Sequence, residues 1–348
     1  MDFVLLKIVV ALAPVLVFLT GFTLLDAFKL MDWRELAALL VGGGALAAIS
    51  YLINWRALDD LPIGFTNYTK YAAPLVEEPL KAGLILVLFA RNRVGFMVDA
   101  AITGFAVGAG FSLVENAIYL YNYPGASLGV WLVRGFGTAV MHGGATAAFG
   151  VVSQYLIERR EKLVGARYRL RWPVFLPGLA AAIVIHGVYN HFPDQPILAM
   201  AFVMLAVPLT LALIFSKSEH GAHRWLLHEY ETHEHMLDDI RAGRLEASEA
   251  GRFILTLSER FGPAVTAAAF EYLKLHTAML ASAEESIMAH EAGQPGAAAA
   301  QVRADFQRLY ALEGEIGRVA LMALRPHLQI SRHELWEMHE LKREAHAT

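Results

Sequence analysis

Residues 71–90 read YAAPLVEEPLKAGLILVLFA, an apolar run that carries two adjacent glutamates, Glu77 and Glu78, and one lysine, Lys81. A helix of ~20 largely apolar residues is long enough to cross a bilayer. Ionisable groups inside such a helix are costly, and they usually face the interior of a helix bundle or a water-filled cavity. The stretch therefore predicts a membrane-spanning helix that contributes to a functional site.

The composition around this stretch is that of a polytopic membrane protein. Of the 348 residues, 56% are hydrophobic and 18% are charged. Beyond about residue 216, charged residues recur every few positions and predict a soluble helical domain of roughly 130 residues. The predicted fold class is all-α, with a transmembrane domain at 1–216 and a cytoplasmic helical domain at 217–348. About seven spans are expected, at 3–25, 35–54, 71–90, 96–122, 128–157, 172–192 and 195–216.

Basic residues are unevenly distributed among the predicted loops. Arg91 and Arg93 follow the third span, and further lysines and arginines lie between residues 159 and 171, whereas the loops 121–127 and 192–195 have none. Loops rich in Lys and Arg generally stay in the cytoplasm. We therefore expect the N-terminus outside the cell and the C-terminal domain in the cytoplasm.

Charge and cysteine content exclude several classes of function. The formal net charge of −4 gives no indication of a nucleic-acid partner. The partners that we expect are the lipid bilayer and other proteins. The chain has no cysteine, which excludes disulfides, thiolate catalysis and cysteine-ligated zinc sites.

Other predicted spans also carry polar residues that a bilayer disfavours. On the predicted topology, those of the third, fourth and sixth spans lie in one layer roughly 10 Å below the outer surface, at ~1.5 Å of helix per residue. His186 and Asn190 are spaced i and i+4, which places them on one helix face. The full set of candidate site residues is Glu77, Glu78, Lys81, Glu115, His142, His186 and Asn190.

These residue types suit two kinds of hydrolytic site. A carboxylate in a medium of low dielectric constant is well placed to take a proton from water, while an imidazole and a side-chain amide one turn apart can stabilise an oxyanion. Alternatively, two glutamates and two histidines could bind a divalent metal such as zinc and leave a position open for water. The metal ligands would then be Glu78, Glu115, His142 and His186. The residues alone leave both readings open.

Three short motifs follow one another in the order of a known family. They are Glu-Glu-x-x-Lys at 77–81, Phe-x-x-x-Glu at 111–115 and His-x-x-x-Asn at 186–190. Over about residues 70–195 the chain resembles the PrsW-type intramembrane proteases, bacterial relatives of the type II CAAX prenyl endopeptidases in the ABI superfamily. It departs from the superfamily pattern because Lys81 is one residue closer than the usual arginine and Glu115 replaces a histidine.

The resemblance implies an endopeptidase of the bacterial inner membrane that cleaves a membrane-anchored protein near the outer face, for example an anti-sigma factor. If the matching positions have the roles that they have in the family, Glu77 or Glu78 would activate water with help from Glu115. His186 and Asn190 would then stabilise the tetrahedral intermediate. The family reading leaves open whether the site uses no cofactor or one divalent metal.

Two other functions compete with proteolysis. The buried cluster could bind a metal, a proton or a lipid head group and signal to the C-terminal domain without cleaving anything. It could also relay protons in a secondary transporter, although the chain shows no inverted repeat.

The C-terminal domain carries helical patterns and polar groups that we predict to be solvated. It could form a homodimer or bind a cytoplasmic partner. Ser331 and Glu334 are predicted to form a capping box at the start of a last helix. The polar residues expected on exposed helix faces are His220, His223, His228, His233, His235, Asp238, Asp239, Glu284 and Glu285.

Overall fold

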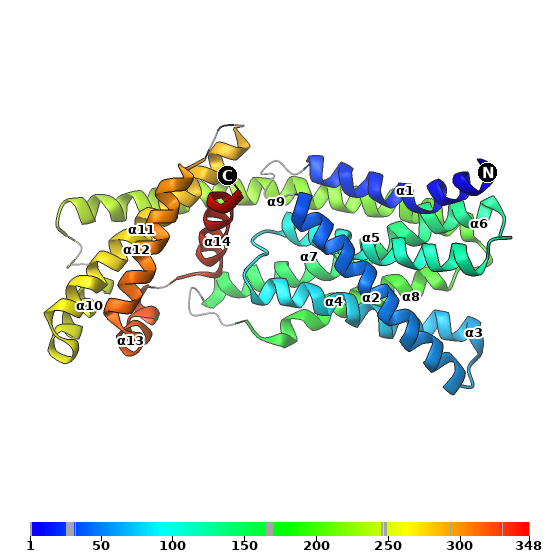
Figure 1. Cartoon of the computed structure of the whole chain (residues 1–348), viewed down its shortest axis with the longest axis horizontal. Helices are drawn as coiled ribbons and strands as arrows, with labels where there is room; N and C mark the ends of the chain where they lie inside the picture. Colours follow the sequence, from blue (N-terminus) through cyan, green and yellow to red (C-terminus); the bar gives the residue numbers. More distant parts are fainter. Residues whose placement is uncertain are drawn as a thin grey trace. The chain divides into compact units, whose positions relative to one another are not determined.

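The structure is a computed structural model that describes residues 2–25, 31, 33–164, 170–244, 246, 249–292, 294, 296–328 and 330–347. The described part is helical throughout, which confirms the predicted all-α class (Figure 1). Its elements are α1 Asp2–Leu25, α2 Trp33–Asp60, α3 Gly64–Asn67, η1 Tyr68–Ala72, α4 Ala73–Ala90, α5 Met97–Asn122, α6 Leu128–Leu132, η2 Val133–Thr138, α7 Ala139–Val164, η4 Trp172–Phe175, α8 Leu176–Asn190, α9 Pro196–Arg241, α10 Glu249–Phe261, α11 Pro263–Glu291, α12 Ala299–Ile316, α13 Arg318–Leu328 and α14 Arg332–Ala347.

The chain divides into two compact units. The first contains Met1–Arg159 and Leu170–Glu219, and the second contains Arg160–Arg169 and His220–Thr348. Helix α9 begins in the first unit and ends in the second. Its first half is apolar and its second half is polar.

Five helices of the first unit are long and apolar enough to cross a membrane: Val4–Leu25, Trp33–Asp60, Met97–Asn122, Trp172–Asn190 and Pro196–Ser218. The protein is therefore a multi-pass membrane protein. The two other predicted spans are helical as well, in α4 and in the run from α6 to α7. Helix α4 carries Glu77, Glu78 and Lys81, so its crossing depends on how these charges are paired.

Helix α5 is the central helix of the membrane unit. It packs along α2 and also contacts α1, α4 and η2. All residues from Val98 to Ser112 are buried. A helix that is apolar on all sides is expected to lie inside a bundle or a membrane, and α5 is enclosed by protein.

Glycines on α5 allow its neighbours to approach the backbone closely, as small residues do between membrane helices. A Cβ atom added at Gly108 would lie 2.3 Å from the carbonyl oxygen of His142 on α7. A Cβ atom added at Gly110 would lie 2.0 Å from the carbonyl oxygen of Leu40 on α2. These two contacts bring α7, at His142, and α2, at Leu40, against α5.

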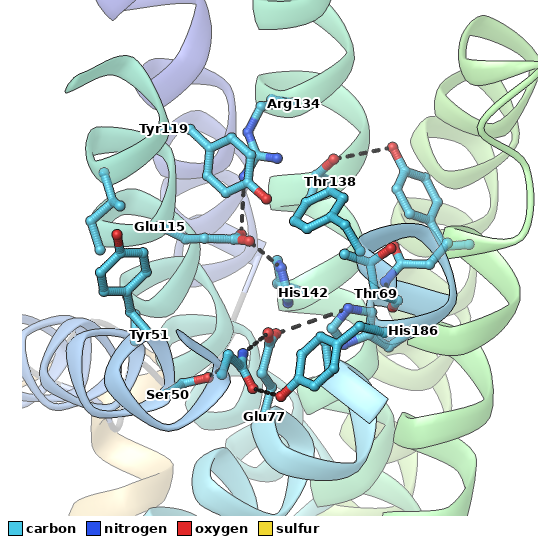
Figure 2. A pocket seen from close by; sticks show the side chains of 18 of the residues that line it. Ser50, Tyr51, Thr69, Glu77, Glu115, Tyr119, Arg134, Thr138, His142 and His186 are labelled. Carbon is cyan, nitrogen blue, oxygen red and sulfur yellow. Dashed lines mark hydrogen bonds and ion pairs between the residues drawn. The ribbon is translucent and has the colours of Figure 1, made fainter. Parts of the chain in front are cut away.

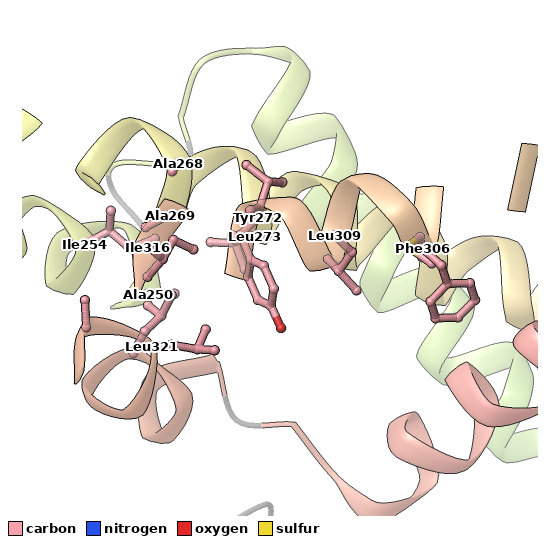
Figure 3. Close-up of a cluster of buried hydrophobic side chains, with 14 of the residues drawn as sticks. Ala250, Ile254, Ala268, Ala269, Tyr272, Leu273, Phe306, Leu309, Ile316 and Leu321 are labelled. Carbon is pink, nitrogen blue, oxygen red and sulfur yellow. The ribbon is translucent and has the colours of Figure 1, made fainter. Parts of the chain in front are cut away.

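The second unit has a hydrophobic core of its own, formed by α10 to α14 (Figure 3). Ile254, Leu312 and Leu324, on three different helices, are all fully buried in it. The predicted capping box is confirmed: Ser331 N donates to Glu334 Oε2 at 2.9 Å and Glu334 N donates to Ser331 Oγ at 3.0 Å. It opens α14.

The prediction that the polar groups of this unit are all solvated is wrong for His233 and Glu284. Both are buried, because α9, α11 and α14 pack around them. Asp238 and Asp239 are exposed as predicted. The side chains of His220, His223 and His228 lie outside the described residues.

Replacing Gly108 by alanine should destabilise the membrane unit by about 1–3 kcal/mol, because the new methyl group meets backbone that cannot move aside. Thermal unfolding of the detergent-solubilised protein measures the change. Gly83→Ala on α4 is the control, since an added Cβ there has no atom within 4 Å. Equal unfolding temperatures for the two variants would contradict the close-approach argument.

Candidate active site

The polar residues of the membrane unit line one cavity of about 590 Å³. Figure 2 shows their side chains pointing from separate helices into the same space. Glu77 comes from α4, Glu115 from α5, His142 from α7, and His186 and Asn190 from α8. The predicted site residues are thus brought together, except that Glu78 and Lys81 lie behind the cavity wall.

Glu78 and Lys81 form a fully buried ion pair. Lys81 Nζ lies 2.5 Å from Glu78 Oε1, and the two side chains are 0% and 1% exposed. The same carboxylate oxygen is 2.7 Å from His186 Nδ1. Because a carboxylate accepts hydrogen bonds, the imidazole donates from Nδ1, which leaves Nε2 directed elsewhere. Glu78 therefore sets the orientation of His186.

Glu77 has one oxygen bound and one oxygen free. Its Oε1 accepts a hydrogen bond from Asn54 Nδ2 at 3.0 Å. Its Oε2 is buried and has no hydrogen-bond partner among the described residues. The nearest imidazole atom, His186 Nε2, is 4.0 Å away. A buried carboxylate oxygen without a donor is unfavourable unless water, substrate or a cation occupies the adjacent space.

Glu115 on α5 and His142 on α7 form a second pair in the cavity (Figure 2). His142 Nε2 lies 3.1 Å from Glu115 Oε2, and Arg134 Nη2 lies 3.2 Å from the same oxygen. Lys81 Nζ is 3.1 Å from His142 Nδ1 and can only donate, so the imidazole donates from Nε2 to Glu115. Both nitrogens of His142 are thus engaged.

Three groups in this cavity could hold a metal ion. One ligand atom each from Glu77, His142 and His186 lies within 4.8 Å of the others. These residues fit a metal ion, because Glu77 Oε2 and His186 Nε2 accept no hydrogen bond from the described residues. The other nitrogen of His186 is held by Glu78, and carboxylates commonly hold histidine ligands in this way. His142 would first exchange one of its present partners. Of the ligands predicted from sequence, His142 and His186 belong to this group, whereas Glu78 and Glu115 do not, and Glu77 is the carboxylate in it.

A family model, PrsW family intramembrane metalloprotease, matches residues 32–214. The chain belongs to this PrsW family. No curated protein and no solved structure matches it. Family membership confirms the resemblance stated from the three motifs and makes the protein a membrane peptidase at the level of the family. The described cavity lies entirely within the matched residues.

Asn190, the last residue of the predicted PrsW motifs, lines the cavity without contacting the Glu–His cluster directly. Its Nδ2 donates to the backbone oxygen of Thr69 at 2.9 Å. Thr69 belongs to η1, a π-helical turn just before α4, and a second π-helical turn, η2, carries Arg134 and Thr138. Such turns are frequent at functional sites, because they re-aim side chains.

The sequence analysis missed three polar residues that support Glu77. Asn54 donates to Glu77, and Tyr68 Oη in turn donates to Asn54 Oδ1 at 2.8 Å. Ser50 accepts from Asn54 one helical turn earlier, at 3.2 Å. Asn54 lies at the end of a predicted span, and Ser50 lies on the same helix face one turn earlier. Two polar side chains on one face of a span could have indicated these residues from the sequence.

Lys81→Met should destabilise the membrane unit by about 3–5 kcal/mol, because it leaves Glu78 as an uncompensated buried charge. The double variant Lys81→Met/Glu78→Gln removes both charges and should recover most of this loss. Thermal unfolding in detergent of the wild type, the two single variants and the double variant measures the coupling. Strictly additive effects would show that the two groups do not form the pair described here.

Proposed function

We propose that the protein is an endopeptidase for membrane-anchored proteins, in which Glu77 activates the attacking water. The free, buried Oε2 of Glu77 at the wall of a cavity of about 590 Å³ carries this proposal. A water in contact with this oxygen can lose its proton to the carboxylate as it attacks a peptide carbonyl. The family match supports the class of reaction.

Glu78 is the less suitable base of the two adjacent acids. Its Oε1 already takes hydrogen bonds from Lys81 and His186, and the residue does not line the cavity. We assign Glu78 the role of a positioning residue, which holds His186 toward Glu77. The sequence had left open which of the two glutamates is the base.

Donors for the developing oxyanion lie on the other walls. The amide of Asn190 has two N–H groups and uses one for Thr69, so the second is available. Arg134 also lines the cavity and supplies positive charge beside Glu115. His186 can donate from Nε2 only in its protonated form, since Nδ1–H is bound to Glu78.

A divalent metal such as zinc would be held by Glu77, His142 and His186. When bound, such an ion polarises a water or a carbonyl oxygen. In that case Glu77 would be a ligand of the ion rather than the base, while Glu78 would still fix His186 and Asn54 would still fix Glu77.

The position of the cavity supports cleavage near the outer face. Its lining includes Asp59, Tyr123 and Phe192, which lie at the ends of α2, α5 and α8. The loops after α5 and α8 contain no Lys or Arg, and basic loops generally stay in the cytoplasm. We propose a bacterial inner-membrane protein with its C-terminal unit in the cytoplasm, acting on substrates such as an anti-sigma factor.

Glu77→Gln should lower the cleavage rate at least about 100-fold, because an amide cannot accept the proton from water. Mass spectrometry of membrane-protein termini, in cells carrying wild type or variant, measures the effect and identifies the substrate. Glu35→Gln is the control, since Glu35 lies on α2 outside the cavity lining. Identical sets of termini in all three strains would refute proteolysis and favour a sensor.

If Glu77, His142 and His186 hold an ion, removing divalent ions from the purified protein with a chelator should abolish cleavage of the substrate so identified, and adding zinc should restore it. The reason is that Glu77 and His186 present free ligand atoms that an ion would join. Full activity of the metal-free enzyme would instead support the mechanism in which Glu77 activates water without an ion. In that mechanism Glu77→Gln still lowers the cleavage rate.

A further inference from the structure

A second group of buried carboxylates and an imidazole lies in the C-terminal unit. It is formed by Glu229 and His233 on α9, Glu284 on α11, and Glu334 and Glu337 on α14. Neither the family match, which ends at residue 214, nor the proposed proteolysis uses it. From one helix to the next, these residues are at least fifty positions apart in the sequence.

His233 is oriented by one carboxylate and faces two others. Its Nδ1 lies 2.8 Å from Glu284 Oε1, and Glu284 is fully buried. Its Nε2 points toward Glu334, whose Oε1 is 3.8 Å away. One ligand atom each from Glu229, His233 and Glu334 lies within 4.8 Å of the others. A carboxylate that holds one imidazole nitrogen while the other faces an ion is the usual support of a histidine ligand.

The capping box fixes the second ligand. Glu334 Oε2 accepts the backbone N–H of Ser331, so its other oxygen, Oε1, is left to face His233. The carboxylate is thus held in place by the start of α14, with Oε1 directed toward the imidazole of His233.

Glu337 is a buried carboxylate of this group that lacks hydrogen-bond donors in the described part of the chain. It is 0% exposed, and neither of its carboxylate oxygens has a hydrogen-bond partner among the described residues. Burial raises its pKa well above the ordinary value, and the nearby charges of Glu284, Glu334 and Glu229 raise it further. Glu284 Oε2 is buried without a partner as well.

We propose that Glu229, His233 and Glu334 bind a divalent first-row metal ion such as Zn²⁺ or Mn²⁺, with Glu284 orienting His233 and Glu337 adding negative charge. Imidazole and carboxylate ligands suit these ions. Glu229 and Glu334 are only partly buried, which gives an ion a route of entry. The ion would join α9 to α14 and supply the positive charge that the buried acids lack.

The rival explanation is a network of protonated acids around His233, without any ion. The unpartnered oxygens of Glu337 and Glu284 do not separate the two explanations, because the ion would be bound by Glu229, His233 and Glu334. The two explanations predict opposite responses to added metal.

The test uses the full-length protein in detergent, freed of metal and then dialysed against low Zn²⁺ or Mn²⁺. Bound ions per chain are counted by mass spectrometry, and the unfolding temperature is recorded with and without the ion. His233→Ala should remove one ion per chain relative to wild type, together with the rise in unfolding temperature that the ion causes. Glu284→Gln keeps the side-chain shape and should weaken binding roughly 10- to 100-fold.

Two controls lie next to these positions. His235→Ala and Glu285→Gln change the same residue types at exposed sites on α9 and α11, and both should bind as wild type does. Because each comparison counts a difference of one ion, an ion in the membrane cavity does not affect it. Equal ion counts in all five proteins, or an unfolding temperature that does not respond to the ion, would overturn the proposal.

Discussion

The buried contact between Lys81 and Glu78 is the constraint on which the membrane site depends. Both groups are almost completely enclosed, so water cannot solvate either charge. Each charge must therefore be compensated by the other. The pair also reaches two further helices, because Glu78 holds His186 on α8 and Lys81 contacts His142 on α7. One ion pair thus fixes the orientation of both cavity histidines and lets a helix with three charged residues lie in an apolar bundle.

The positions of the site residues along the membrane could be predicted from sequence. Counting residues from the ends of the spans places Glu77, Glu115 and His186 at one depth, and the structure brings them into one cavity. Depth follows from the rise per residue alone. Rotation of each helix about its axis does not, because it depends on which neighbour each face meets. For that reason the different surroundings of Glu77 and Glu78, and the contact from Asn54, emerged only from the packing.

The C-terminal unit illustrates the same limit more strongly. Glu284 and Glu285 are adjacent and chemically identical, yet the first is fully buried and the second is exposed. A polar side chain inside a helical pattern is usually solvated, and this expectation was correct for Asp238 and Asp239. It was wrong for Glu284 because α11 meets α9 there, and nothing in the local sequence of α11 reveals a histidine fifty-one positions earlier. The capping box, in contrast, is local and was predicted correctly.

The two polar clusters have the same local arrangement and differ in charge. In each, a buried glutamate holds Nδ1 of a histidine, His186 or His233, and Nε2 faces another carboxylate. The membrane cluster contains Lys81, whose Nζ lies 2.5 Å from the buried acid Glu78. In the C-terminal cluster the charges that act on the buried Glu337 are those of three more carboxylates. The first arrangement therefore contains its own basic side chain, whereas the second requires protons on its acids or on His233, or a bound cation.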